Sequence, residues 1–332
     1  MQQRQLGRSG LTVSALGLGC MGMTYAYDTA ASRSESEALA TVKLALDQGI
    51  NFLDTAEVYG PWENESLLGR AIAGRRHEVI IASKFGFKLD AQGTVTGLDS
   101  HPDNVRAACE QSLRRLGVET IDLYYQHRLD PNVAIEETVG AMADLVRAGK
   151  VRYLGLSEVG VEILRRACAV HPIAALQSEY SLWERNVEPQ ILPACRELGV
   201  GFVPFSPLGR GFLTGQAPRA EGVADPSDIR ADMPRFQGEN YDRNLALVAV
   251  LKGLAERKGC TSAQLALAWL LSKGPDIVPI PGTKSCKHLA ENAAAAEVTL
   301  SGCDLMAIEQ TFPRNAAAGA RYNAQMESLV NR

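Results

Sequence analysis

The sequence lacks a long apolar segment and an excess of charge of either sign. Its most apolar helix-like stretch, residues 265–271, is far too short to cross a bilayer, and the first residues contain no apolar core of a secretory signal. The 34 basic and 38 acidic side chains give a net charge of −4, which offers no attraction to a polyanion. We therefore expect a cytoplasmic protein that binds neither nucleic acid nor a membrane.

The sequence also lacks the patterns of a disulfide framework or a metal site. Its seven cysteines are odd in number, scattered, and never spaced as C-x-x-C, which is typical of reduced thiols. The predicted strand ends carry neither a His-x-His pair nor a cluster of histidines and carboxylates. A metal-dependent barrel hydrolase is therefore disfavoured, and we expect no metal.

What the chain does contain is a repeated order of helix, glycine and strand. Ser34 and Glu37 have the spacing of a capping box, an apolar face follows, and Gly49 precedes an apolar run. The same order returns at three more glycines, Gly117, Gly149 and Gly199. Short glycine-ended turns from helix to strand are typical of βα repeats with a parallel sheet.

Eight strands are predicted, at residues 16–19, 51–54, 79–84, 121–127, 151–157, 174–179, 201–205 and 277–279. Eight βα units fit a (β/α)8 TIM barrel, with residues 1–332 as a single α/β domain. A doubly wound open sheet is the alternative, and it requires the strand order to reverse. Polar groups gather at the carboxyl ends of nearly all the strands, which favours the barrel.

Three segments lie outside this repeat. Residues 4–15 are predicted to form a β-hairpin that plugs the inactive end of the barrel. Residues 206–243 are a long connection rich in glycine, proline and charge, which favours a lid or clamp. Residues 300–332 are predicted to add one more helix and a tail.

Four ionisable side chains stand where predicted strands end: Asp54, Tyr59 shortly after it, Lys84 and His127. Because the carboxyl ends of neighbouring parallel strands converge, we expect these groups to meet. A tyrosine has an ordinary pKa of ~10, and a nearby ammonium lowers it. Tyr59 is thus predicted to donate a proton, with Lys84 and Asp54 behind it and a neutral His127 orienting a carbonyl oxygen.

A second group of residues points to a phosphate-bearing cofactor. Barrels commonly bind phosphate in the loops after strands seven and eight, against a helix amino terminus. The candidates after the last strand are Gly282, Thr283, Lys284 and Ser285, with Glu291 and Asn292 on the helix beyond. The candidates after strand seven are Phe205, Ser206, Pro207, Leu208, Gly209 and Arg210, in which the ring could stack on a heterocycle and Arg210 meet a pyrophosphate.

The run Gly17-Leu18-Gly19-Cys20-Met21-Gly22 matches the G-x-G-x-x-G dinucleotide pattern. That pattern must open a helix directly and be followed by an acidic strand end ~20 residues later. Here the helix begins only near Ser34 and the next acidic strand end is Asp54. We interpret the run as the first βα turn of a barrel, with Met21 as a cofactor contact, and not as a Rossmann site.

With these residues in view, the chain resembles the aldo-keto reductase superfamily, in its bacterial and plant branch, over nearly its whole length. The residues that carry the resemblance are 51–60, Ser83-Lys84, Gln126-His127, 155–157, 205–209 and 280–284. The resemblance implies a barrel that binds NADP(H) without a Rossmann domain, with Asp54, Tyr59, Lys84 and His127 as a catalytic tetrad. It further implies that Ser157 and Gln177 hold the nicotinamide carboxamide, that Phe205 stacks on that ring, and that the adenosine 2′-phosphate and adenine are gripped by Lys284, Ser285, His288, Glu291 and Asn292.

The sequence departs from the family pattern at three of these positions. Glu158 stands where many members carry Asn, Phe205 where Tyr is frequent, and His288 where many carry Arg. The last difference weakens the expected preference for NADP over NAD. Trp62 and Arg128 are candidates for substrate contact, and the 206–243 segment and the tail could also shape the substrate pocket.

We therefore expect an NADP(H)-dependent oxidoreductase that reduces aldehydes or ketones, with a small-molecule carbonyl as partner. The sequence is compatible with a homo-oligomer and does not determine the oligomeric state. The alternative is an NADPH-sensing regulatory subunit on the same barrel, with little turnover.

Overall fold

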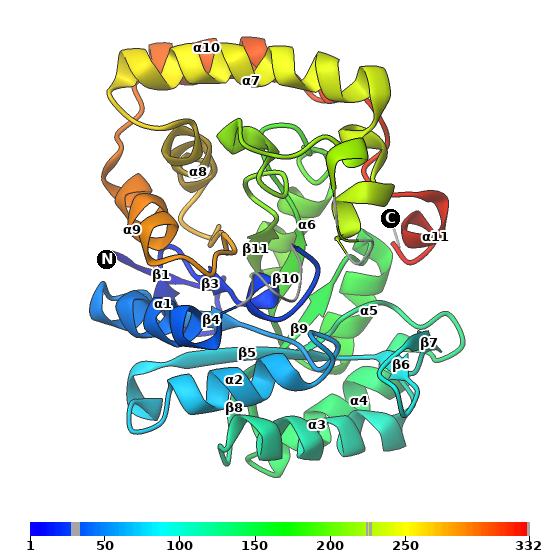
Figure 1. The fold of residues 1–332 in the computed structure, drawn as a ribbon. Coiled ribbons are helices and arrows are strands. Elements are labelled where there is room, and N and C mark those ends of the chain that lie inside the picture. Colours follow the sequence, from blue (N-terminus) through cyan, green and yellow to red (C-terminus); the bar gives the residue numbers. More distant parts are fainter. Residues whose placement is uncertain (28–33, 224, 226–227, 331–332) are drawn as a thin grey trace.

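The computed structural model describes residues 1–27, 34–223, 225 and 228–330, which form a (β/α)8 barrel (Figure 1). Its parallel strands pair in the order β11-β10-β9-β8-β5-β4-β3. They are β3 (Leu18–Gly19), β4 (Phe52–Asp54), β5 (Ile80–Phe85), β8 (Ile121–Gln126), β9 (Val151–Ser157), β10 (Ile173–Glu179) and β11 (Gly201–Phe205). Because the order never reverses along the chain, the doubly wound alternative is excluded.

The eighth position is filled by residues 276–282, which close the barrel without forming a regular strand. The N–H groups of Gly17 and Gly19 donate to the carbonyls of Pro279 and Pro281 at 2.9 and 3.2 Å, and the opposite edge of the segment hydrogen bonds with β11. Proline has no N–H, so neither proline can donate toward β3. The strand predicted at 277–279 is in the right place, but its prolines prevent a complete ladder.

Helices surround the sheet: α1 (Glu35–Asp47), α2 (Glu63–Ala71), α3 (Pro102–Leu116), α4 (Ile135–Arg147), α5 (Val161–Val170), α6 (Ile191–Leu198), α7 (Gly238–Lys258), α8 (Ser262–Ser272) and α9 (Cys286–Ala294). The Ser34 side chain caps α1 by accepting the N–H of Glu37, as predicted. Gly117 and Gly199 end α3 and α6 with φ of 66° and 73°, a backbone that glycine adopts without strain. No helix within the described ranges is long and apolar enough to cross a bilayer.

The predicted hairpin consists of β1 (Gln3–Gln5) and β2 (Thr12–Ser14), which pair antiparallel. Leu6, Leu11 and Val13 are buried in one cluster with side chains from the barrel interior, such as Phe52 and Val203. The backbone at Leu6 also approaches the first residue of β11 so closely that only glycine fits there. The hairpin therefore seals the amino end of the barrel and leaves the carboxyl end for a site.

The additions to the barrel differ in detail from the prediction. A hairpin of β6 (Phe87–Leu89) and β7 (Val95–Leu98) follows β5 and was not predicted. The 206–243 connection contains η4 (Phe212–Thr214), η5 (Ala220–Gly222), η6 (Ile229–Asp232) and η7 (Pro234–Phe236), and α7 already begins at Gly238. After α10 (Gly302–Thr311), which packs along α7 (Figure 1), the tail forms a second helix, α11 (Ala324–Glu327). Residues 224, 226–227 and 331–332 of these segments lie outside the described residues.

Candidate active site

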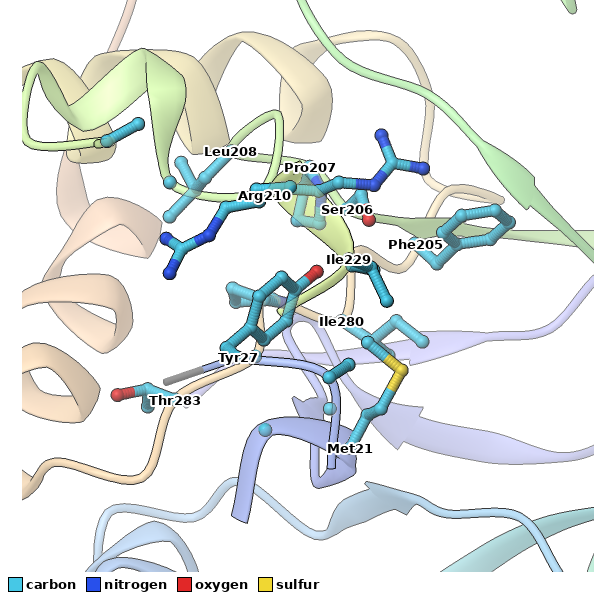
Figure 2. Close-up of a pocket in the computed structure, with 18 of the residues that line it drawn as sticks. Met21, Tyr27, Phe205, Ser206, Pro207, Leu208, Arg210, Ile229, Ile280 and Thr283 are labelled. Carbon is cyan, nitrogen blue, oxygen red and sulfur yellow. The ribbon is translucent and has the colours of Figure 1, made fainter. Parts of the chain in front are cut away.

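A cavity of about 1180 Å³ opens among the residues at and beyond the carboxyl ends of the strands. Pockets for drug-sized ligands range up to about 1,000 Å³, so this cavity can hold a ligand larger than a drug-sized molecule. Figure 2 shows Phe205, Ser206, Pro207, Leu208 and Arg210 along one side of the cavity, and Met21, Tyr27 and Ile280 along the other. The first side follows β11, and the second comes from the first βα turn and the closing segment.

Lys84 joins three of the four predicted catalytic residues. Its ammonium, fully buried on β5, donates to Asp54 Oδ1, to the carbonyl of Thr55 at 2.8 Å and to the hydroxyl of Tyr59 at 3.3 Å. β4 and β5 are parallel neighbours, so Asp54 and Lys84 end adjacent strands on the same side of the barrel. Asp54 and Tyr59 line the cavity, and Lys84 lies beneath them.

His127 completes the group from the end of β8. Its ring meets the Tyr59 ring edge-on, with centroids 5.8 Å apart, and the Phe87 ring at 4.9 Å. Burial, assisted by the nearby Arg128 and Lys84 cations, holds the pKa of His127 well below its ordinary value. The imidazole is therefore neutral near pH 7 and can present one N–H and one lone pair.

Burial decides the pKa of Tyr59. It raises that pKa, and the Lys84 ammonium opposes the rise without reversing it, so the net pKa lies above the ordinary value. The expectation that Lys84 makes this phenol more acidic than free tyrosine is therefore wrong. For Lys84 itself, burial disfavours the ammonium, but Asp54 and Tyr59 outweigh burial and raise its pKa. The site holds a protonated phenol beside a stable cation.

Glu57 is buried in the loop between Asp54 and Tyr59, and it does not line the cavity. Its carboxylate accepts the N–H of Gly86 at 3.0 Å, and its backbone N–H donates to the carbonyl of Lys84. Burial raises the pKa of Glu57 to about 7, against the Gly86 hydrogen bond, which lowers it. Folding therefore favours a protonated Glu57 over a range where the unfolded chain has already lost that proton.

Glu57→Gln should raise the free energy of unfolding at pH 8 and change it little at pH 5. A raised folded-state pKa adds stability at low pH that is lost as pH rises from about 4.5 to about 7. Between pH 5 and pH 8 the wild type should thus lose about 2–3 kcal/mol of unfolding free energy that the variant keeps. Urea unfolding at both pH values measures the difference. The exposed Glu63→Gln is the control, and equal pH slopes for wild type and Glu57→Gln would contradict the prediction.

The opposite end of the cavity is formed around α9. Thr283, Lys284, Ser285, His288, Glu291 and Asn292 all line it, as does Gly282. Within the described residues, no side chain caps the amino terminus of α9, although Ser285 occupies the cap position. A helix amino terminus with a lysine and a hydroxyl beside it is suited to an anion.

Three residues predicted to contact cofactor or substrate do not line the cavity: Ser157, Gly209 and Trp62. Ser157 is buried behind the wall and accepts a hydrogen bond from Arg128 at 3.2 Å. Gly209 packs against the Trp183 indole, where a Cβ would come within 2.6 Å of the ring. Trp62 precedes α2 with a left-handed φ of 65°. The other predicted cofactor and substrate residues, including Met21, Gln177, Arg128 and 205–208, are cavity residues.

Two buried carboxylates at the strand ends, Glu158 and Glu179, are paired with arginines. Arg210 donates to both oxygens of Glu179 at 3.0 and 2.9 Å, so the guanidinium predicted to meet a pyrophosphate already has a protein partner. Arg321 from the tail donates to Glu158 and lies 3.5 Å from Glu179. Both guanidiniums lie over the Tyr322 ring. These ion pairs fix the tail to the barrel, and they occupy the carboxylate of Glu158.

Sequence reasoning named the tail as a segment that could shape the pocket, but it singled out none of its residues. Tyr322, Asn323, Gln325, Met326 and Leu329 line the cavity together with the predicted catalytic group. Their nearest signal is Arg321-Tyr322 in an otherwise Ala- and Asn-rich stretch, which has no motif of its own. In the described part of the chain, no group of three or more His, Cys, Asp or Glu side chains is placed to hold a metal ion.

Comparisons with known proteins agree with the barrel fold. The model of the Aldo/keto reductase family matches residues 15–311. "Probable aldo-keto reductase 1" of Glycine max is 48% identical over 323 residues, covering 97% of this chain and 92% of the soybean protein. A glycerol dehydrogenase from Gluconobacter oxydans superposes with a TM-score of 0.84 at 28% identity, covering 96% of this chain and 97% of its own. An aldo-keto reductase from Bacillus halodurans, solved in its holo form, gives 0.78 at 30% identity, covering 96% and 98%.

Proposed function

Because this chain belongs to the aldo/keto reductase family of oxidoreductases, we propose that it is an NADP(H)-dependent reductase of aldehydes and ketones. The observation that carries the proposal is the contact at the cavity wall between the Tyr59 hydroxyl and Lys84 Nζ, 3.3 Å apart, with Asp54 holding the same ammonium. A phenol backed by a paired cation suits one task above others, which is to protonate an oxygen as negative charge develops on it.

The residues around the cavity fit a phosphate-bearing nicotinamide dinucleotide. Phe205 offers a ring for stacking, and Gln177 also lines the cavity. The Gln177 amide donates to Asp54 Oδ2 at 2.8 Å and is thereby oriented. Lys284 and Ser285, at the amino terminus of α9, would hold the 2′-phosphate. The volume of about 1180 Å³ leaves room for a carbonyl substrate beside such a cofactor.

In this proposal, the cofactor supplies the hydride and the protein supplies the proton. Tyr59 gives its proton to the carbonyl oxygen, and its raised pKa keeps it protonated until that moment. Lys84 then stabilises the phenolate, while Asp54 keeps the lysine charged and in place. His127, neutral because it is buried, orients the same oxygen with a ring N–H.

NADPH consumption tests the proposal. Purified protein would be mixed at neutral pH with NADPH and a panel of sugar-derived, aromatic and steroid-like carbonyls, and the assay repeated with NADH. We expect turnover with at least one class and a preference for NADPH. Tight NADPH binding without turnover on the whole panel, together with a stable complex with a membrane partner, would instead support the regulatory subunit.

Lys284→Met should weaken the binding of NADPH and leave the binding of NADH nearly unchanged. Removing a cation that pairs with a phosphate should raise the KM for NADPH about 10- to 100-fold, whereas NADH has no 2′-phosphate to lose. Lys287→Met, an exposed change in the first turn of α9 and outside the cavity wall, is the control. If KM rose equally for both cofactors, Lys284 would not be the residue that reads the 2′-phosphate.

We also propose that the protein acts in the cytoplasm. All seven cysteines are free thiols, and Cys20, Cys109 and Cys195 are buried. Free thiols are the rule in a reducing compartment.

A further inference from the structure

Most cations at the reaction end of the cavity are neutralised by a carboxylate of the protein. Lys84 is paired with Asp54. Arg210 is paired with Glu179 and Arg321 with Glu158, each pair buried. These charges therefore cancel locally and are satisfied before any substrate binds.

Arg128 differs from them. It follows His127 directly, lines the cavity and is half-buried, and among the described residues no carboxylate lies within ion-pair distance of it. Its Nη1 donates to the carbonyl of His127 at 2.7 Å and to Ser157 Oγ at 3.2 Å. These two bonds fix the direction of the guanidinium.

The rest of the Arg128 fork remains available. Nε and Nη2 have no hydrogen-bond partner among the described residues. Neither atom is fully buried, so both can reach a ligand in the cavity. Parallel N–H groups in this arrangement match the two oxygens of a carboxylate. The Arg128 cation adds to the burial that lowers the pKa of His127 and opposes the burial that raises the pKa of Tyr59, so its charge lies close to the proton donor.

The walls beside Tyr59 are apolar. Val58 and Tyr59 form a cluster against which Phe87 packs, and Val95 and Met326 add further apolar surface to the cavity. A substrate here would place its carbonyl at Tyr59, an apolar stem along these walls and a charged end at Arg128. Resting on the proposed reductase function, we propose that the substrate class is carbonyl compounds that also carry a carboxylate, and that Arg128 selects them by binding that carboxylate.

Two aromatic aldehydes of nearly equal shape test this selection. 4-Carboxybenzaldehyde carries the carboxylate, and methyl 4-formylbenzoate is its neutral ester. Wild-type kcat/KM should favour the acid by about 10-fold or more, and Arg128→Gln should lower that acid-to-ester ratio about 10- to 100-fold. The substitution also removes the hydrogen bonds of Arg128 to Ser157 and His127, but any loss of activity from that cause should affect both aldehydes alike. The ratio of kcat/KM for the acid to kcat/KM for the ester is therefore the quantity to measure.

Further measurements separate the selection from a structural role. Arg128→Lys keeps the charge without the fork and should give an intermediate ratio. Arg114→Gln, which removes an exposed arginine on α3, should leave the ratio unchanged. In the wild type alone, kcat/KM for the acid should fall as salt rises toward ~1 M, while that for the ester should not. NADPH titration by fluorescence shows whether each variant is folded and binds cofactor.

The two proposals fail in different ways. A wild type that reduces the ester as well as the acid, or reduces only the ester, overturns the selection by Arg128 and leaves the reductase standing. An unchanged ratio in Arg128→Gln also overturns the selection and assigns Arg128 to positioning Ser157. A wild type inert toward every carbonyl overturns the reductase itself.

Discussion

Tyr59→Phe should lower kcat by about 10²- to 10⁴-fold and leave cofactor binding nearly unchanged. The change removes one oxygen atom, the one that lies 3.3 Å from Lys84 Nζ, and with it the only proton that this side chain can donate. The ring itself remains to pack against His127. Steady-state turnover with the best carbonyl of the panel, beside an NADPH titration by fluorescence, measures both quantities.

Tyr153→Phe is the matched control for this prediction. Tyr153 lies on β9, packs against the interior cluster and does not line the cavity, so removal of its hydroxyl should leave kcat within about threefold, as is usual for changes away from the chemistry. Near wild-type turnover in Tyr59→Phe with NADPH still bound would contradict the general-acid role. The oxygen would then have to receive its proton from His127 or from water.

The strand ends could be predicted because two local signals coincide. Gly49 ends α1, and Gly117 ends α3, each shortly before an apolar run that stops at a polar residue. In a parallel barrel every such stop lies at the same end, so strand location alone brought Asp54, Lys84 and His127 together. The closing segment was less predictable, since Pro279 and Pro281 interrupt its donors while its place in the barrel is kept.

The ion pairs with the tail could not be predicted, because their partners are far apart in the chain. Arg321 and Glu158 are separated by 163 residues, and neither belongs to a sequence motif that predicts the other as its partner. Glu158 has a positive φ of 56° immediately after β9. Glycine or asparagine would indicate such a backbone in a sequence, but glutamate does not. Side-chain pairing across a fold depends on the final packing, and periodicity carries no information about it.

The pKa of Tyr59 shows the same limit at a single residue. The sequence supplied the correct neighbour, Lys84, and the correct sign of its effect. It did not supply the degree of burial, which is the larger effect here and has the opposite sign. The proposed mechanism changes accordingly: in it, Lys84 stabilises the phenolate that forms and does not ionise the phenol beforehand.

Lys84→Met should cost about 3–5 kcal/mol of unfolding free energy at pH 7 as well as most of the activity. The substitution leaves the carboxylate of Asp54, only 3% exposed, without its cation, and breaking a buried pair from one side is strongly destabilising. Guanidinium unfolding and kcat measure the two losses. Lys43→Met, an exposed change on α1, is the control and should alter neither.

The double variant Asp54→Asn with Lys84→Met separates stability from catalysis. Removing both charges leaves no unpaired ion, so it should recover most of the stability that Lys84→Met lost, while turnover stays low because nothing stabilises the phenolate of Tyr59. The single variant should also regain stability as pH falls: burial raises the folded-state pKa of Asp54, and a raised carboxyl pKa favours folding at low pH. Recovery of turnover along with stability would show that the ion pair serves only the fold, and Lys84 would then have no part in the chemistry.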